Sequence, residues 1–238
     1  MRKLAFVVFL MCMVALPSAH ASALAFRHTT TNAEILVQTV PGPTISEKVS
    51  SRAKSSWSWY ITRASGLFAA LSLIILMVSG IGQVTGYTYR FLEPLTDWAS
   101  HRALGITFGI SILLHVFSLL FDHFVPFNIA QLFIPWLSGY KPVTIWGVHL
   151  GSLYVALGVI AFYLIAGVII TSLTWVDKKP ATWKLIHLLS YFALLLVFIH
   201  ALYLGTDLAH GVFRFVWVCL GLVTILFCLH RLWRAKTV

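Results

Sequence analysis

The sequence predicts an all-α, polytopic membrane helix bundle with five spans after a signal peptide, or six if the signal segment is retained. Of its 238 residues, 59% are hydrophobic and only 10% are charged, and the mean hydropathy is +0.89. A soluble globular domain carries about 25% charged residues, so this chain has too much apolar surface for a water-facing fold. Long apolar segments with tryptophans at several of their ends are typical of helices that cross a bilayer.

The N-terminus has the three parts of a secretory signal peptide. Arg2 and Lys3 form a basic region, residues 4–16 form an apolar region, and Ala19 to Ala21 fit a small-residue cleavage site. The apolar region is too short to span a bilayer comfortably. We expect residues 1–21 to be removed, and the alternative is a retained anchor that adds a sixth span.

The rest of the chain divides by composition. Residues 22–56 are polar, contain Pro41-Gly42-Pro43 and show no sustained period, so we predict an exported, largely irregular tail. A transmembrane domain is predicted over 57–232, and a short cytoplasmic tail over 233–238. The predicted spans, each long enough for about 30 Å of hydrocarbon, are 57–83, 97–121, 144–175, 181–204 and 212–232.

Basic residues predict the orientation. They gather around the loop between the third and fourth predicted spans and at the end of the last span, at Lys178, Lys179, Lys184, Arg231, Arg234 and Lys236. The positive-inside rule therefore places the C-terminus in the cytoplasm and the N-terminal tail outside. With the signal peptide, this predicts a multi-pass protein of the bacterial inner membrane. The net charge of +10 is explained by basic residues that orient the protein in the lipid bilayer, so nucleic acid is not expected as a partner.

Two predicted spans each carry a pair of histidines. His101 and His115 are fourteen residues apart, and His187 and His200 are thirteen apart. Both spans run from inside to outside, so the histidines match in depth at two levels separated by about 20 Å. On an ideal helix, two side chains fourteen residues apart point in directions that differ by about 40°, whereas two that are thirteen apart differ by about 140°. The second helix therefore needs a bend, a bulge or ligation from two flanks.

Ionisable residues inside a membrane indicate function, because burying them unpaired is costly. Imidazole is a good ligand for iron, copper and zinc. Four histidines matched in depth on parallel helices favour two planar cofactors held by bis-histidine ligation, that is, low-spin haem b without covalent links. The simpler alternative is that each histidine packs against a neighbouring helix.

Other residues support or extend this site. Arg102 and Arg63 lie at the membrane edges, where a guanidinium can pair with haem propionates or extend to the interface. Gly105 and Gly109 would let a macrocycle lie against their helix, or would serve close helix packing. His123, beside Asp122, and His149 are weaker candidates for a metal or proton site.

The seven acidic residues avoid the middle of the spans, which disfavours a proton pump or cation transporter.

The sequence resembles the ferric reductase-like transmembrane domain family over about residues 58–232. This family includes iron and copper reductases, NADPH oxidases and the haem subunit of the periplasmic methionine sulfoxide reductase system. The matching stretches are RASGLFA from Arg63, HRALG from His101, TS at Thr171-Ser172, and WKLIHLLSY from Trp183 followed by His200.

The resemblance implies two stacked haems, with His101 and His187 on the cytoplasmic-side haem and His115 and His200 on the outer one. The sulfoxide reductase subunit typically lacks a histidine at the position of His101, so its presence here favours two haems, with one as the alternative. The family's flavin and nicotinamide domains are expected after the last span, where this sequence has few residues. We therefore expect a separate electron donor: a flavoprotein, a quinol or another subunit.

These expectations add up to a transmembrane b-type cytochrome that passes electrons to an outer-side acceptor, such as ferric iron, oxygen or a periplasmic redox protein. The closest alternative is a quinol-oxidising di-haem cytochrome b subunit of the cytochrome b561 type. Two further alternatives are a haem or metal transporter that uses histidine relays and an assembly subunit with packing histidines.

Overall fold

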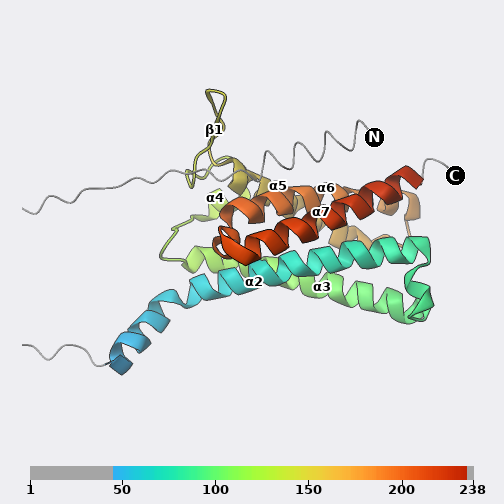
Figure 1. Ribbon diagram of the computed structural model, residues 1–238, viewed down its shortest axis with the longest axis horizontal. Coiled ribbons are helices and arrows are strands. Elements are labelled where there is room, and N and C mark those ends of the chain that lie inside the picture. Colours follow the sequence, from blue (N-terminus) through green and yellow to red (C-terminus); the bar gives the residue numbers. More distant parts are fainter. Residues whose placement is uncertain (1–44, 235–238) are drawn as a thin grey trace, which may run out of the picture. The chain divides into compact units, whose positions relative to one another are not determined.

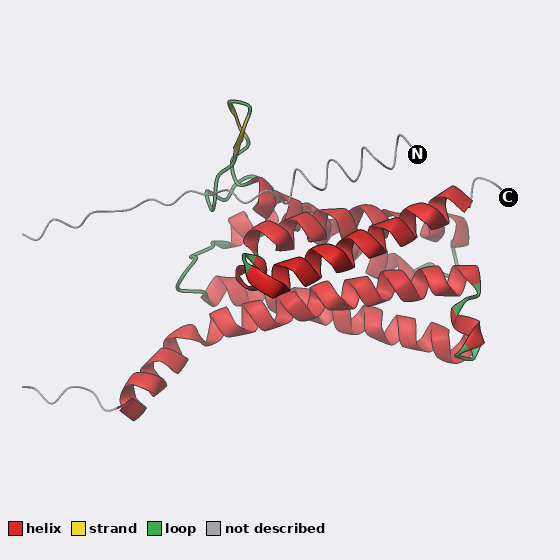
Figure 2. Ribbon diagram, in the orientation of Figure 1, coloured by secondary structure: helices red, strands yellow, loops and turns green. Residues whose placement is uncertain are grey.

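The computed structural model describes residues 45–234, which fold into a bundle of long helices with a single short strand pair (Figures 1 and 2). Among these residues, five helices are long and apolar enough to cross a membrane. They are α2 (Ile45–Thr85), α3 (Pro94–Ser118), α5 (Leu153–Thr174), α6 (Pro180–Leu204) and α7 (Gly211–Arg234). The predicted all-α membrane bundle is confirmed, and the predicted signal peptide lies outside the described residues.

Short elements connect the long helices. The shortest connections, between α5 and α6 and between α6 and α7, join helices that run in opposite directions, whereas α3 is joined to α5 by a long loop. The short elements are η1 (Thr88–Arg90), η2 (Leu119–Phe121), α4 (Ile129–Phe133), β1 (Thr144–Ile145), β2 (Val148–His149) and η3 (Thr206–Leu208).

The third predicted span, 144–175, is wrong at its start. Residues 144–149 form the antiparallel β1–β2 hairpin, which projects sideways from the bundle (Figure 1), and helix α5 begins only at Leu153. The hairpin turn holds Trp146 at φ 50° and Gly147 at φ 80°, and Gly151 follows at φ 56°. These left-handed conformations interrupt a right-handed helix, although the local composition is apolar enough to extend it.

The predicted irregular tail also differs from the structure near its end. Helix α2 begins at Ile45, so residues 45–56 continue the helix of the first span rather than forming an irregular connector. Once a packed span has nucleated a helix, each further residue adds a hydrogen bond without a new nucleation cost. A polar composition without a clear period therefore did not exclude helix here.

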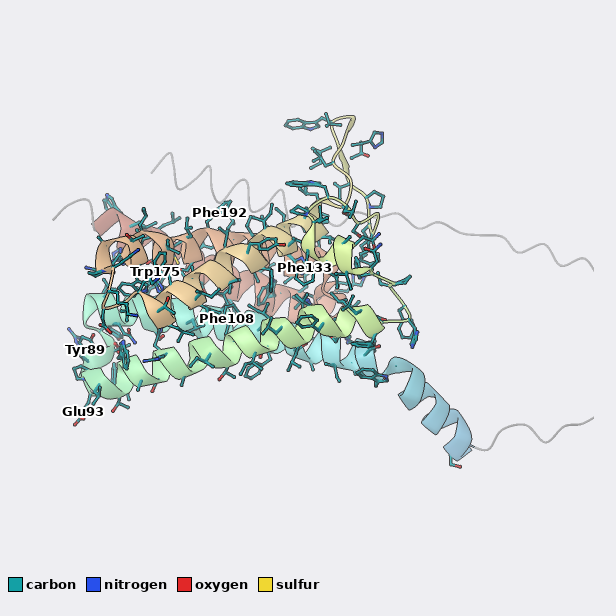
Figure 3. The ribbon with its side chains drawn as sticks, turned by 180° about the vertical axis from the view of Figure 1, so that it is seen from behind. Tyr89, Glu93, Phe108, Phe133, Trp175 and Phe192 are labelled. Carbon is teal, nitrogen blue, oxygen red and sulfur yellow. The ribbon has the colours of Figure 1, made fainter. Side chains whose placement is uncertain are left out.

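The helices pack as two antiparallel pairs closed by α7. Helix α2 packs along α3, α5 packs along α6, and α7 contacts both α2 and α6. Within the described bundle, α3 and α6 are not among the helix pairs whose backbones approach closely. The middle layer is apolar and includes Phe108, which is labelled on α3 in Figure 3, together with Ile165 and Leu194. The two histidine-bearing helices are thus held apart by their partners.

Proline sets the matching depth of α3 and α6. Pro94 and Pro180 each occupy the first turn of their helix, where the missing N–H costs nothing and the fixed φ suits a helix. His101 follows Pro94 by seven residues, and His187 follows Pro180 by seven. The two helices therefore start in the same register relative to their first histidines.

We expect Gly221→Ala to destabilise the bundle by about 1–3 kcal/mol, the usual cost of overpacking. An added Cβ at buried Gly221 would collide with the ring of Phe198, which is only 3% exposed. Thermal unfolding in detergent measures this change. Gly167→Ala is the matched control, because a Cβ there meets nothing within 4 Å. Equal stability of the two variants would contradict the prediction.

Candidate functional site

The four predicted histidines meet as two pairs between α3 and α6. The ring centres of His101 and His187 are 6.4 Å apart, and those of His115 and His200 are also 6.4 Å apart. Early residues of α3 thus face early residues of α6, and late residues face late ones, so the two helices run parallel as predicted. We call His101–His187 the inner pair and His115–His200 the outer pair, after the predicted orientation.

Backbone carbonyls fix both rings of the outer pair. Nδ1 of His115 lies 2.9 Å from the carbonyl oxygen of Thr62 on α2, and Nδ1 of His200 lies 2.8 Å from that of Tyr154 on α5. A carbonyl can only accept, so Nδ1 is the donor in each bond. The proton therefore resides on Nδ1, and Nε2 keeps a free lone pair that can bind a metal.

At the inner pair, serine hydroxyls are the hydrogen-bond partners of Nδ1 in place of backbone carbonyls. Nδ1 of His101 lies 2.7 Å from Oγ of Ser79 on α2, and Nδ1 of His187 lies 3.2 Å from Oγ of Ser172 on α5. The Ser79 hydroxyl donates to the carbonyl of Leu76 at 3.3 Å, which leaves its oxygen to accept from His101. Each histidine is thus oriented by the neighbouring helix, as metal-ligating histidines commonly are.

Glycines on these neighbouring helices make room for the rings. A Cβ added to Gly66 would come within 2.8 Å of the His115 ring, and one added to Gly158 within 2.5 Å of the His200 ring. Each glycine lies one helical turn after the residue whose carbonyl holds that ring. The sequence contains both glycines, but their position one turn after an anchoring residue can be recognised only when it is known which helices are neighbours.

The two glycines predicted to support a cofactor have less to do with the rings. A Cβ at Gly109 would meet the side chain of Ile169, and one at Gly105 would meet nothing within 4 Å. Gly109 therefore serves close helix packing, which was the alternative interpretation. That Gly105 also lies beside a cofactor remains a prediction.

The two histidines on α6, thirteen residues apart, are both anchored by the neighbouring helix α5. Nδ1 of His187 meets Ser172 and Nδ1 of His200 meets Tyr154, while the ring centres lie 6.4 Å from those of their partners on α3. The ring planes of the inner pair are inclined by 51° and those of the outer pair by 87°. The two ring pairs therefore meet at different inclinations, and how α6 accommodates the thirteen-residue spacing at a cofactor stays a prediction.

The ring separations fit a metal held between two imidazoles. Two metal–nitrogen bonds of about 2.0 Å each, plus about 1 Å from each nitrogen to its ring centre, add up to roughly 6 Å. The separation of 6.4 Å at both pairs matches this sum. Among the described residues, no three His, Cys, Asp or Glu side chains gather into a metal-ion site. Two imidazoles at this separation fit the histidine ligation expected of a b-type haem, whose presence stays a prediction.

A cavity of about 260 Å³ lies at the outer pair and is lined by His115, His200, Gly66 and Gly158. Arg63 also lines it, and its Nε donates to Oδ2 of Asp207 at 2.8 Å while a terminal nitrogen donates to Oδ1. The guanidinium lies 4.0 Å from the ring centre of Trp59. The hydrogen bond from Arg63 holds the pKa of the Asp207 carboxyl below its usual range.

The remaining predicted residues lie away from the ring pairs. Arg102 is exposed, and its guanidinium lies 5.3 Å from the ring centre of Trp98. His123 is exposed, while the carboxylate of the neighbouring Asp122 is buried and accepts the N–H of Phe124. His149 is exposed on β2, where its Nδ1 lies 2.9 Å from the Thr144 hydroxyl across the hairpin. Roles of Arg102 and Arg63 toward propionates remain predictions.

Comparison with known proteins supports the sequence resemblance. Residues 83–198 match the family model described as "Ferric reductase like transmembrane component". This segment contains all of α3 and α5 and most of α6, with three of the four paired histidines. No curated protein and no solved structure matches the chain.

The Arg63–Asp207 ion pair predicts a pH-dependent stability. Because the pKa of Asp207 is lowered, its contribution is present above the unfolded-state pKa of about 3.9 and is lost as the pH falls through the lower folded-state value. We expect Asp207→Asn to cost about 1 kcal/mol at pH 7 and this difference to shrink below about pH 4. Thermal unfolding between pH 7 and 3 measures it.

The matched control for this prediction is Asp177→Asn, which removes an exposed carboxylate in the turn between α5 and α6. It should leave stability unchanged throughout the pH range. A wild-type advantage over Asp207→Asn that is as large at pH 3 as at pH 7 would contradict the role assigned to the ion pair.

Proposed function

With residues 83–198 identified as a ferric reductase-like transmembrane component, we propose that the protein is a b-type cytochrome of the bacterial inner membrane. It carries electrons across the bilayer through two bis-histidine haems to an outer-side acceptor, such as ferric iron or a periplasmic redox protein. A separate donor, which can be a flavoprotein, a quinol or another subunit, supplies the electrons on the cytoplasmic side.

One observation carries this proposal: at both histidine pairs the ring centres are 6.4 Å apart, which would admit a metal between two imidazoles, and all four rings are engaged through Nδ1. Histidines that only pack between helices need no such repetition at two depths. A transporter needs ligands that exchange their cargo, whereas rings fixed by a neighbouring helix are suited to permanent ligation. The same arrangement at two levels favours two resident cofactors.

The protein's own residues bind, orient and insulate. The four Nε2 atoms would hold the haem irons, and the Nδ1 partners would fix the tautomer and the ring orientation. Haem bound at each pair supplies one-electron redox chemistry. Phe108, Ile165 and Leu194 lie in the buried apolar layer of the bundle and exclude water from it. Low polarity around a haem is one of the factors by which a protein sets its potential.

The arginines have proposed roles at the two ends. Arg63 lines the outer cavity beside His115 and is the better placed of the two to pair with a propionate there. Arg102 follows His101 directly in sequence and is proposed to do the same at the inner end. Exposed Lys178 and Lys179 in the turn between α5 and α6 support a cytoplasmic inner end.

Haem quantification tests the proposal. We expect two haems b per chain in the purified wild type, by pyridine haemochrome and by the reduced-minus-oxidised spectrum. His101→Ala and His115→Ala should each lose one haem, because each removes one axial ligand of a different site.

The other outcomes separate the alternatives. One haem that is insensitive to His101→Ala would indicate a single-haem protein that resembles the sulfoxide reductase subunit. Absence of haem in every preparation would overturn the cytochrome assignment in favour of a transporter or an assembly subunit. Rapid reduction of the wild type by added quinol would identify the donor as a quinol, as in the quinol-oxidising di-haem cytochrome b.

A second prediction concerns the glycine beneath the outer pair. Gly158→Ala places a Cβ against the ring of His200, so the ring must move or α5 and α6 must separate. We expect loss of the outer haem alone, measured as a fall from two haems to about one. Gly167→Ala on the same helix, where a Cβ has room, should keep both haems, and an equal loss in the two variants would contradict this prediction.

A further inference from the structure

The hydroxyl of Ser172 is shared between two side chains of α6. Its Oγ lies 3.2 Å from Nδ1 of His187 and accepts a hydrogen bond of 3.0 Å from the indole nitrogen of Trp183. Trp183 lies one turn before His187, and the centres of the two rings are 5.4 Å apart. Among the anchors of the four histidines, only this one has a tryptophan as a second donor in the described residues.

The chemistry of the donors fixes the direction of these bonds when His187 acts as a ligand. Indole nitrogen can only donate. A neutral imidazole that binds metal through Nε2 carries its proton on Nδ1, and it therefore donates as well. One serine oxygen must then accept from Trp183 and from His187 at the same time. An acceptor that serves two donors polarises each of them less than an acceptor that serves one.

The acceptor at Nδ1 controls how strongly an imidazole donates electrons to its metal. A stronger hydrogen bond from Nδ1 raises the basicity of the ligand. A more basic ligand stabilises the oxidised metal and lowers the reduction potential. The long bond from His187, at 3.2 Å against 2.7 to 2.9 Å for the other three histidines, marks His187 as the ligand with the weakest such support.

We propose that Ser172 and Trp183 form a tuning pair for the inner site, in which the serine hydroxyl strengthens His187 as a ligand and the tryptophan weakens that support by competing for the same oxygen. This inference rests on the proposed function, because it requires a metal at the inner pair. Both are positioning residues: neither side chain binds the metal, and each acts through His187.

The proposal predicts opposite effects from two substitutions around one oxygen atom. Ser172→Ala removes the acceptor and should raise the midpoint potential of the inner haem. Trp183→Phe removes the competing donor, keeps an aromatic ring beside His187, and should lower it. Each shift should amount to a change of up to about tenfold in the reduction equilibrium, or about 59 mV for one electron. The outer haem should not shift, because its anchors are backbone carbonyls.

The experiment is a redox titration of the purified, haem-loaded full chain, followed optically and by electron paramagnetic resonance. Ser172→Thr retains the hydroxyl and should keep the potential near that of the wild type. Trp175→Phe is the matched tryptophan control. Trp175 lies at the end of α5, in the turn that leads to α6, and its ring centre is 5.0 Å from Nζ of Lys179. It should leave both potentials unchanged.

The outcomes separate this inference from the proposed function. Unchanged potentials, or shifts of the same sign in Ser172→Ala and Trp183→Phe with two haems present, would overturn the tuning role and leave the cytochrome intact. If Ser172→Ala loses the inner haem, Trp183→Phe decides, since it keeps the hydroxyl. Absence of an inner haem in the wild type would instead overturn the two-haem function.

Discussion

The hydrogen bond between each histidine and a neighbouring helix is the interaction on which the rest of the site depends. An imidazole in an apolar bundle is costly unless its polar atoms find partners. Thr62 and Tyr154 offer carbonyls, and Ser79 and Ser172 offer hydroxyls. With Nδ1 satisfied in this way, each ring is fixed in one orientation, and Nε2 is left free of the anchoring bond.

The bundle repeats one plan twice. In each half, the first helix of an antiparallel pair supplies the anchors and the second supplies the histidines: α2 with α3, and α5 with α6. Proline at the start of α3 and α6 gives both second helices the same register. The two halves face each other through their imidazoles, so the matched depths follow from a shared construction. A looser form of this repeat is visible in the sequence as the two histidine pairs.

The inner and outer levels differ in ways that suit different tasks. The outer rings are held by backbone carbonyls, which a side-chain substitution cannot remove, and their cavity is bordered by the Arg63–Asp207 ion pair. The inner rings are held by hydroxyls, which selection can alter one residue at a time. Under the proposed function, this difference in anchoring would give the two sites different reduction potentials.

The sequence by itself determined the class of fold, the approximate spans and the four histidines with their two depths. Hydrophobic length and a rise of about 1.5 Å per residue are local properties, so they can be read without knowing which helices are neighbours. The hairpin at 144–149 was missed because left-handed backbone at Trp146 is a choice that apolar composition does not reveal. The tertiary structure alone decided that Gly66 and Gly158 lie against the rings, that Ser172 serves two donors, and that Arg63 pairs with Asp207. Most of these contacts join different helices, and which residues meet is set by how each helix is rotated against its partner, a quantity that no single segment encodes.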